Sequence, residues 1–284
     1  MTASGDFVAY IVPPVDADPS NEILFNVSEH IARITLNRPT RANALTATMM
    51  PALRDIWRRV DEDADIRCVL ITGAGEKHFC TGADLQNVAD AREVGVGLGP
   101  ASHELFLTSR QNKVWKPTIC AVNGTVTGAG LHFVVDSDIV VASTNASFLD
   151  SHVNVGMVGG PENAGLARRL PLGTALRMTL QGRNFRLSAE RAYTLGLVEE
   201  LVAPDQLIAT AETIAKDIAR NSPHAVSLSQ QAVWSSVEMP YTQSVEYSYG
   251  LVKTHWQHPD FLEGPLAFAE KREARWTVPN APGQ

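Results

Sequence analysis

The chain has 284 residues, 44% of them hydrophobic and 19% charged, with a formal net charge of -7 at pH 7. This length can bury a full core, and the acidic balance argues against non-specific nucleic-acid binding, which depends on neutralising phosphates. No apolar run approaches the roughly 20 residues that a membrane span needs, and the start of the chain lacks the pattern of a secretion signal. Three cysteines without metal-like spacing favour reduced thiols in a cytoplasmic protein and argue against a zinc or disulfide scaffold.

Several elements can be predicted in the first part of the chain. Residues 1–21 carry several prolines and little hydrophobic periodicity, so we expect a flexible N-terminal leader there. Beyond it, apolar spacing predicts two strands of a hairpin, a helix, a short buried strand and a second helix. In chain order these elements cover 22–27, 31–36, 46–60, 68–72 and 102–115.

Residues 118–132 combine a strand, a turn of small residues and the start of a helix. The apolar run 118–122 predicts the strand, and small residues fill 128–130 before apolar spacing resumes at Leu131. The N–H groups of such a turn lie at the positive end of a helix dipole, where developing negative charge is favoured. An equal interpretation is a tight connection in which the glycines serve packing alone. A second small-residue turn, 78–84, follows the preceding strand in the same way.

The second half of the chain begins with strands and ends with helices. Strands are predicted at 139–142 and 147–149, and a glycine-rich loop then leads to a helix that begins near Pro161. Helical patterns follow at 173–181, 188–195, 204–220, 223–236, 241–256 and 259–274. We therefore predict an α/β layered core over 22–205 and a helical C-terminal region over 206–284.

A set of short segments, taken together, resembles the crotonase (enoyl-CoA hydratase/isomerase) superfamily. They lie in the family's order at 37–45, 78–84, 116–124, 128–130, 137–140, 189–198, 263–264 and 268–272. The resemblance implies an α/β fold in which ββα turns form a spiral core, with a helical C-terminal trimerisation region. It also implies a homotrimer or dimer of trimers, a coenzyme A thioester as substrate, and neither a metal nor another cofactor.

The family's chemistry gives the two small-residue turns a role. An enolate-like transition state places negative charge on the thioester oxygen, and two main-chain N–H groups aimed at that oxygen stabilise it. By motif position these oxyanion-hole donors are the amides of Ala83 and Ala129. The resemblance further implies substrate contacts at Arg38, Arg41, Gly82, Asp84, Gly128, Phe268 and Lys271.

The acid–base residues depart from the family pattern. Hydratases of this family use two glutamates, but His132 and His152 stand at the corresponding positions. One hypothesis makes these histidines the acid/base pair of a lyase or isomerase of fatty acid metabolism, with Asp150 or Glu162 orienting a ring. Glu162 is itself a catalytic candidate, although an acid at a helix start is also favoured by the dipole alone.

Two other functions stay open from the sequence. In one, His152 activates water for C–C cleavage of a β-diketone or a β-keto thioester, as in diketone hydrolases that the Asp150–His152 segment resembles. In the other, the chain is a non-catalytic acyl-CoA-binding relative that keeps the pocket without the two acids.

Overall fold

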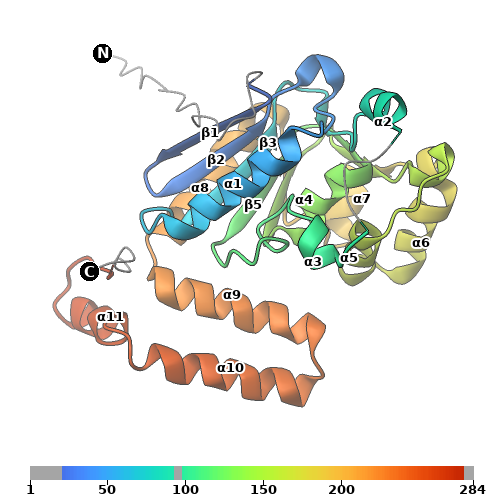
Figure 1. Ribbon diagram of the computed structural model, residues 1–284. Helices are drawn as coiled ribbons and strands as arrows, with labels where there is room; N and C mark the ends of the chain where they lie inside the picture. Colours follow the sequence, from blue (N-terminus) through green and yellow to red (C-terminus); the bar gives the residue numbers. More distant parts are fainter. Residues whose placement is uncertain (1–20, 93–97, 278–284) are drawn as a thin grey trace, which may run out of the picture.

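The computed structural model describes residues 21–92 and 98–277, so the predicted leader lies outside the described residues except for its last position. A six-stranded sheet with the order β1-β2-β3-β5-β7-β10 forms the centre of the fold (Figure 1). Its strands are β1 (Ile23–Ser28), β2 (Ile31–Leu36), β3 (Cys68–Gly73), β5 (Thr118–Val122), β7 (Ile139–Ser143) and β10 (Glu200–Val202). The β1–β2 hairpin is antiparallel, as predicted, and every other pair in this sheet is parallel.

A second, four-stranded sheet has the order β4-β6-β8-β9. Its strands are β4 (His78–Cys80), β6 (Thr125–Thr127), β8 (Ser147–Leu149) and β9 (Leu187–Ser188). One short strand follows each of β3, β5 and β7, so the chain passes repeatedly from the large sheet to the small one. This alternation is the ββα arrangement that the resemblance implied. Because β4, β6 and β8 are parallel, the segments that follow them emerge at one edge of the small sheet.

The large sheet is buried on both faces. Helix α1 (Met49–Glu62) covers one face and α8 (Leu207–Ala219) covers the other. In β3 the side chains alternate, so that Val69 belongs to the core on the α1 side and Leu70 to the core on the α8 side. This burial explains why the central strands are short, continuous apolar runs in the sequence.

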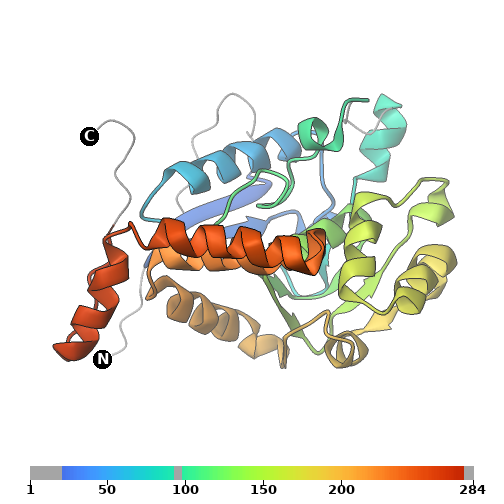
Figure 2. The ribbon, with the colours of Figure 1, turned by 90° about the horizontal axis from the view of Figure 1, so that it is seen from below.

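The other helices surround the small sheet or extend away from both sheets. Those around the small sheet are α2 (Leu85–Ala91), α3 (Ala101–Glu104), α4 (Leu131–Asp136), α5 (Pro161–Arg169), α6 (Leu172–Gln181) and α7 (Ala189–Thr194). The helices α9 (Pro223–Glu238), α10 (Tyr241–His255) and α11 (Asp260–Ala269) follow α8 along one side of the molecule (Figures 1 and 2). Two side chains of α9, Gln230 and Trp234, donate hydrogen bonds to Asp138, directly before β7. Helix α8, the first helix after residue 206, packs into the core of the large sheet.

Two predicted helices are wrong in extent. A helix was expected over 102–115, but α3 ends at Glu104. Further along, Gln111 Oε1 accepts the N–H of Leu107, and Asn112 Nδ2 donates to the carbonyl of Thr108. These side-chain bonds satisfy main-chain groups that a helix would have paired, so the segment folds into turns instead. The last helix was expected to reach 274, but α11 ends at Ala269.

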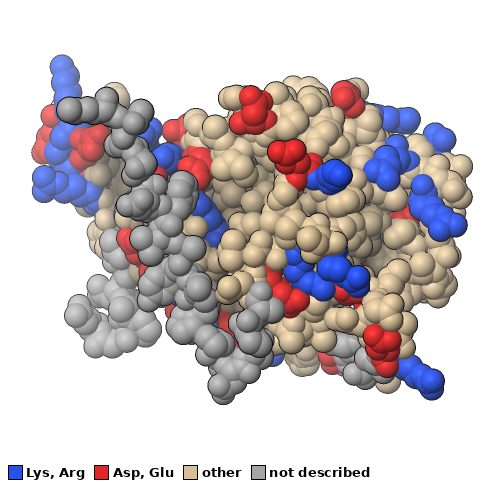
Figure 3. All heavy atoms as spheres, turned by 90° about the horizontal axis from the view of Figure 1, so that it is seen from above, with Lys and Arg blue, Asp and Glu red and all other residues tan. Residues whose placement is uncertain are grey.

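The surface carries mixed charge. On the face drawn in Figure 3, Lys and Arg side chains are interspersed with Asp and Glu, and the described residues visible there form no broad basic area. Among the described residues, no helix combines the length and apolar character needed to cross a bilayer.

The crossing from β5 to β6 gives a test of the fold. A Cβ atom built on Gly124 would lie 2.4 Å from the main-chain carbonyl of Lys77, which is not a flexible group. Gly124→Ala should therefore lower the free energy of unfolding by about 1–3 kcal/mol, as measured by urea unfolding. The control is Gly250→Ala on α10, where an added Cβ meets nothing within 4 Å. Helix propensity should make that change stabilising by up to about 1 kcal/mol, and equal losses in both variants would contradict the prediction.

Candidate active site

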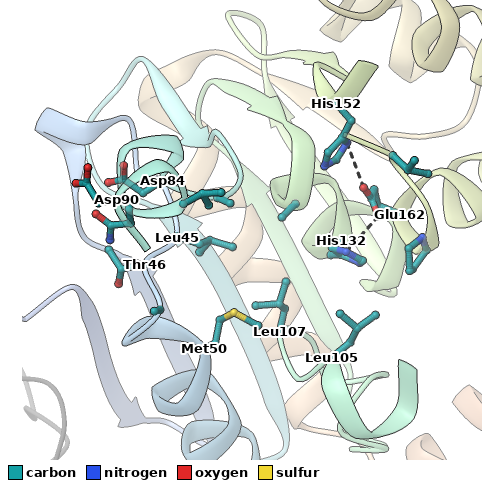
Figure 4. A pocket seen from close by; sticks show the side chains of 17 residues that line it. Leu45, Thr46, Met50, Asp84, Asp90, Leu105, Leu107, His132, His152 and Glu162 are labelled. Carbon is teal, nitrogen blue, oxygen red and sulfur yellow. Dashed lines mark ion pairs between the residues drawn. The ribbon is translucent and has the colours of Figure 1, made fainter. Parts of the chain in front are cut away.

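A cavity of about 500 Å³ opens where β4, β6 and β8 end (Figure 4). Its apolar wall includes Leu45, Met50, Leu105 and Leu107. Its other wall carries the ionisable side chains His132, His152 and Glu162. Both Ala83 and Ala129 also border this space. An apolar compartment therefore faces three groups that can carry or exchange protons.

The two predicted turns meet beside this cavity. A Cβ atom on Gly82 would lie 2.9 Å from the main-chain nitrogen of Ala129, and one on Gly128 would lie 3.6 Å from the Cα of Gly82. Gly82 and Gly128 both have positive φ angles, +83° and +56°, which favour glycine. The parallel pairing of β4 with β6 brings the two turns together, although they are far apart in the sequence.

The main chain at Ala83 is oriented by an isolated parallel bridge to Leu45. Leu45 donates its N–H to the carbonyl of Gly82 at 2.7 Å, and Asp84 donates its N–H to the carbonyl of Leu45 at 2.8 Å. In extended backbone, successive N–H groups point to opposite sides, so the N–H of Ala83 points away from Leu45. The bridge thus uses the carbonyl of Gly82 and the N–H of Asp84, and the N–H of Ala83 lies on the opposite side of the strand.

A buried carboxylate anchors the same turn. Asp84 accepts hydrogen bonds from Arg38 at 3.0 Å and Arg41 at 3.2 Å, and it caps α2 through the N–H of Gln86. Burial alone would raise the pKa of Asp84, but the two guanidinium groups hold it below its usual value. Arg38 also pairs with Glu22 and is 15% exposed, whereas the side chain of Arg41 is 55% exposed. Of these two arginines, Arg41 has the guanidinium that a ligand could reach.

Glu162 lies between the two histidines. Its carboxylate oxygens are each 3.3 Å from a histidine, one from His132 Nε2 and the other from His152 Nδ1 (Figure 4). Glu162 is only 4% exposed, and it stands in the first turn of α5 after Pro161. A helix-start acid would ordinarily face solvent. Here it is buried, with one imidazole beside each of its carboxylate oxygens.

Gln111 determines the tautomer of His132. Its Oε1 accepts the N–H of Leu107 at 2.8 Å, so its Nε2 must be the atom that faces His132 Nδ1 at 3.0 Å. An amide nitrogen can only donate, and His132 Nδ1 therefore holds a lone pair and Nε2 carries the proton. Burial lowers the pKa of His132 more strongly than the nearby Glu162 raises it. The lowered pKa favours neutral His132, whose Nε2 lies 3.3 Å from a carboxylate oxygen of Glu162.

His152 has the opposite environment. Its Nδ1 lies 2.7 Å from the carboxylate of Asp150, which is fully buried and also accepts from Asn163 Nδ2 at 2.7 Å. The hydrogen bond to Asp150 raises the pKa of His152 against the effect of burial. The ring's other nitrogen, Nε2, would be 3.8 Å from a Cβ on Gly128, so this edge faces the turn that carries Ala129. The contact proposed between Asp150 and a histidine ring is present.

Some predicted residues lie elsewhere. Phe268 is 88% exposed near the end of α11, and Lys271 follows that helix; neither lines the cavity. Figure 1 places α11 at the opposite side of the molecule from α2 and α5, which border the site. The thiols of Cys68 and Cys80 are buried, and burial raises the pKa of each to about 12, so both are inert. Gln111 was missed because its segment was expected to be helical.

Known protein families and solved structures are similar to this chain over most of its length. Residues 26–279 match the family model described as enoyl-CoA hydratase/isomerase. The chain is 36% identical over 251 residues to (E)-benzylidenesuccinyl-CoA hydratase of Thauera aromatica, covering 88% of this chain and 96% of that protein. It is 33% identical over 253 residues to carnitinyl-CoA dehydratase of Escherichia coli K12, with 87% and 94% covered. The crystal structure of an enoyl-CoA hydratase/isomerase from Mycobacterium paratuberculosis superposes with a TM-score of 0.82 at 36% identity, covering 91% and 99%.

The Asp150–His152 pair predicts a pH effect. Asp150→Asn should lower the pKa of His152, because the carboxylate that stabilises the imidazolium is lost. A histidine whose pKa is higher in the folded than in the unfolded protein contributes its full stabilisation at pH values below the unfolded-state pKa. It contributes none at pH values above the folded-state pKa. The stability lost in Asp150→Asn should therefore be larger at about pH 5.5 than at about pH 8.5. Histidine titration by NMR and urea unfolding measure the two effects, and Asp65→Asn, in an exposed pair with His30, should leave His152 unchanged.

The tautomer of His132 can be tested separately. Gln111→Glu keeps an acceptor for the N–H of Leu107 but replaces the donor to His132 Nδ1 with a second acceptor. The proton should then move to Nδ1, and the pKa of His132 should rise. Long-range ¹H–¹⁵N NMR spectra distinguish the tautomers, and Gln86→Glu on the exposed face of α2 is the control. An Nε2 proton retained in Gln111→Glu would show that Gln111 does not determine the tautomer.

Proposed function

The chain belongs to the enoyl-CoA hydratase/isomerase family, and we propose that it stabilises the enolate of an acyl-CoA thioester between the N–H groups of Ala83 and Ala129. The observation that carries the proposal is the contact of the Gly82 and Gly128 turns beside a cavity whose far wall holds Glu162. A main-chain donor aimed at a developing oxyanion contributes about 3 kcal/mol to transition-state stabilisation.

We assign the proton transfers to Glu162 and His152. In hydration, a base removes a proton from water as the water oxygen bonds to Cβ, and electrons move to the thioester oxygen. A second group then delivers a proton to Cα. His152 is suited to one of these roles because its Nε2 edge faces the Gly128 turn, and Glu162 is suited to the other. The sequence suggested His132 as a partner of His152, but a neutral His132 whose Nε2 lies 3.3 Å from Glu162 is better suited to positioning that carboxylate.

Reversible hydration of a substituted enoyl-CoA is the reaction that we favour. The two named relatives are a hydratase of benzylidenesuccinyl-CoA and a dehydratase of carnitinyl-CoA. A cavity of about 500 Å³ with an apolar wall has room for an acyl group larger than crotonyl. Double-bond isomerisation would use the same enolate and the same proton carriers without adding water.

The coenzyme A moiety needs contacts beyond this cavity. The exposed guanidinium of Arg41 is near enough to the Asp84 turn to meet its phosphates. Phe268 and Lys271 are remote from the cavity of their own chain, so we assign them to the site of a neighbouring subunit in a homotrimer or dimer of trimers.

A second candidate is hydrolytic C–C cleavage of a β-keto thioester or a β-diketone. The 2.7 Å contact between Asp150 and His152 favours it, because a carboxylate-held imidazole is a suitable base for activating water at a ketone. The cleaved bond would release the same enolate, which then takes up a proton. A third outcome, binding without turnover, would mark a non-catalytic acyl-CoA-binding relative.

Mass spectrometry in ¹⁸O-labelled water separates these reactions. The protein would be incubated with panels of enoyl-CoA, 3-hydroxyacyl-CoA and β-ketoacyl-CoA thioesters. Hydration adds one labelled water to an intact enoyl-CoA, isomerisation adds none, and C–C hydrolysis yields two fragments with label in the new carboxylate. Acyl-CoA binding without any of these products would overturn the catalytic proposal.

Glu162→Gln gives the most direct test of the acid–base assignment. It keeps the size of the side chain but removes its capacity to exchange a proton, so kcat should fall by about 10²–10⁴-fold. Binding of the acyl-CoA, measured by calorimetry, should change little. Asp217→Asn, which removes an exposed carboxylate on α8, serves as the control. Undiminished turnover in Glu162→Gln would remove Glu162 from the mechanism.

A further inference from the structure

Three histidines meet at the junction of α9, α10 and α11, far from the cavity. His224 is the second residue of α9, His255 is the last residue of α10, and His258 lies in the turn before α11. The Nδ1 atoms of His224 and His255 are 2.9 Å apart, and one ring nitrogen from each histidine lies within 4.8 Å of the other two. Figures 1 and 2 place this junction at the side of the molecule opposite α2 and α6.

The three rings of this cluster are packed closely against one another. The rings of His224 and His258 are stacked with their centroids 4.0 Å apart, and His255 stacks on His224 at 5.2 Å. Two adjacent Nδ1 atoms at 2.9 Å need a proton or a cation between them, because two lone pairs facing each other repel.

A buried carboxylate stands behind the cluster. Asp260 is 3% exposed, and its Oδ1 lies 3.7 Å from Nδ1 of His258. The carboxylate is itself held in place by the hydroxyl of Ser222 and the N–H of Thr277. The main-chain N–H of Asp260 donates to Nδ1 of His258 at 3.2 Å, so this nitrogen holds a lone pair and the hydrogen bond fixes the ring. The buried carboxylate of Asp260 adds negative charge close to the three histidines, which favours a cation there.

We propose that His224, His255 and His258 bind one divalent transition-metal ion of the Zn²⁺ type, with water completing a tetrahedral shell. Imidazole is a preferred ligand of Zn²⁺, Ni²⁺ and Cu²⁺. Zn–N bonds of about 2.1 Å bring the three nitrogens to within about 3.4 Å of one another, so the rings must rotate out of their stack. The ion ties together the start of α9, the end of α10 and the start of α11, and it acts as a structural clip for the C-terminal helices.

Metal titration of the full chain tests this proposal. The protein is first dialysed against a chelator, and Co²⁺ is then added while its visible d–d absorption is recorded, followed by competition with Zn²⁺. We expect one ion per chain and a rise in the melting temperature on adding Zn²⁺. His255→Ala and His258→Gln should each weaken binding at least about tenfold and remove the thermal shift.

Two control variants separate this site from other histidines. His152→Ala removes an imidazole from the cavity, and His103→Ala removes an exposed one from α3; both should bind the ion as the unmodified chain does. Circular dichroism confirms that each variant is folded, and His258→Gln preserves much of the side-chain volume if His255→Ala does not fold. The proposal is overturned if the unmodified chain binds no ion, or if His258→Gln binds it unchanged. Loss of binding in His152→Ala alone would place the ion in the cavity instead.

Discussion

Parallel pairing of β4, β6 and β8 determines where the chemistry of this protein lies. Each of these short strands is followed directly by a segment with a different role: the Gly82 turn, the Gly128 turn and the Asp150–His152 pair. Parallel strands end at one edge, so segments about 46 and 24 residues apart in the chain arrive side by side. If the register of one of these pairs shifted by a residue, the main-chain groups and the imidazoles would no longer face the same space.

The two histidines of the site have different surroundings, which shift their pKa values in opposite directions. His132 and His152 each lie 3.3 Å from one carboxylate oxygen of Glu162, but burial lowers the pKa of His132, whereas the hydrogen bond to Asp150 raises the pKa of His152. Groups whose pKa values are driven apart in this way are suited to separate acid and base roles. The partners Gln111 and Asp150 therefore matter as much to the chemistry as the rings that they hold.

Much of the fold was predictable from sequence because it depends on local patterns. Buried parallel strands gave continuous apolar runs, such as 118–122, and the turns at Gly82 and Gly128 were marked by small residues. The helix expected over 102–115 was wrong because Gln111 and neighbouring side chains bond to the main chain, a competition that apolar spacing does not reveal. The central place of Glu162 also could not be deduced, because it depends on contacts with side chains 30 and 10 residues away in the sequence.

Because the Gly82 turn contacts the main chain of Ala129, substitutions at Gly82 and substitutions at the two alanines should have different effects. Main-chain N–H groups are supplied by every residue except proline, so ordinary substitutions at the alanines leave them in place. At Gly82, by contrast, any side chain would force the turns apart. Acid–base side chains such as His132 and His152 can be exchanged one at a time without disturbing that backbone geometry. A scaffold built in this way can acquire a new reaction through its side chains while keeping its means of holding a negative charge.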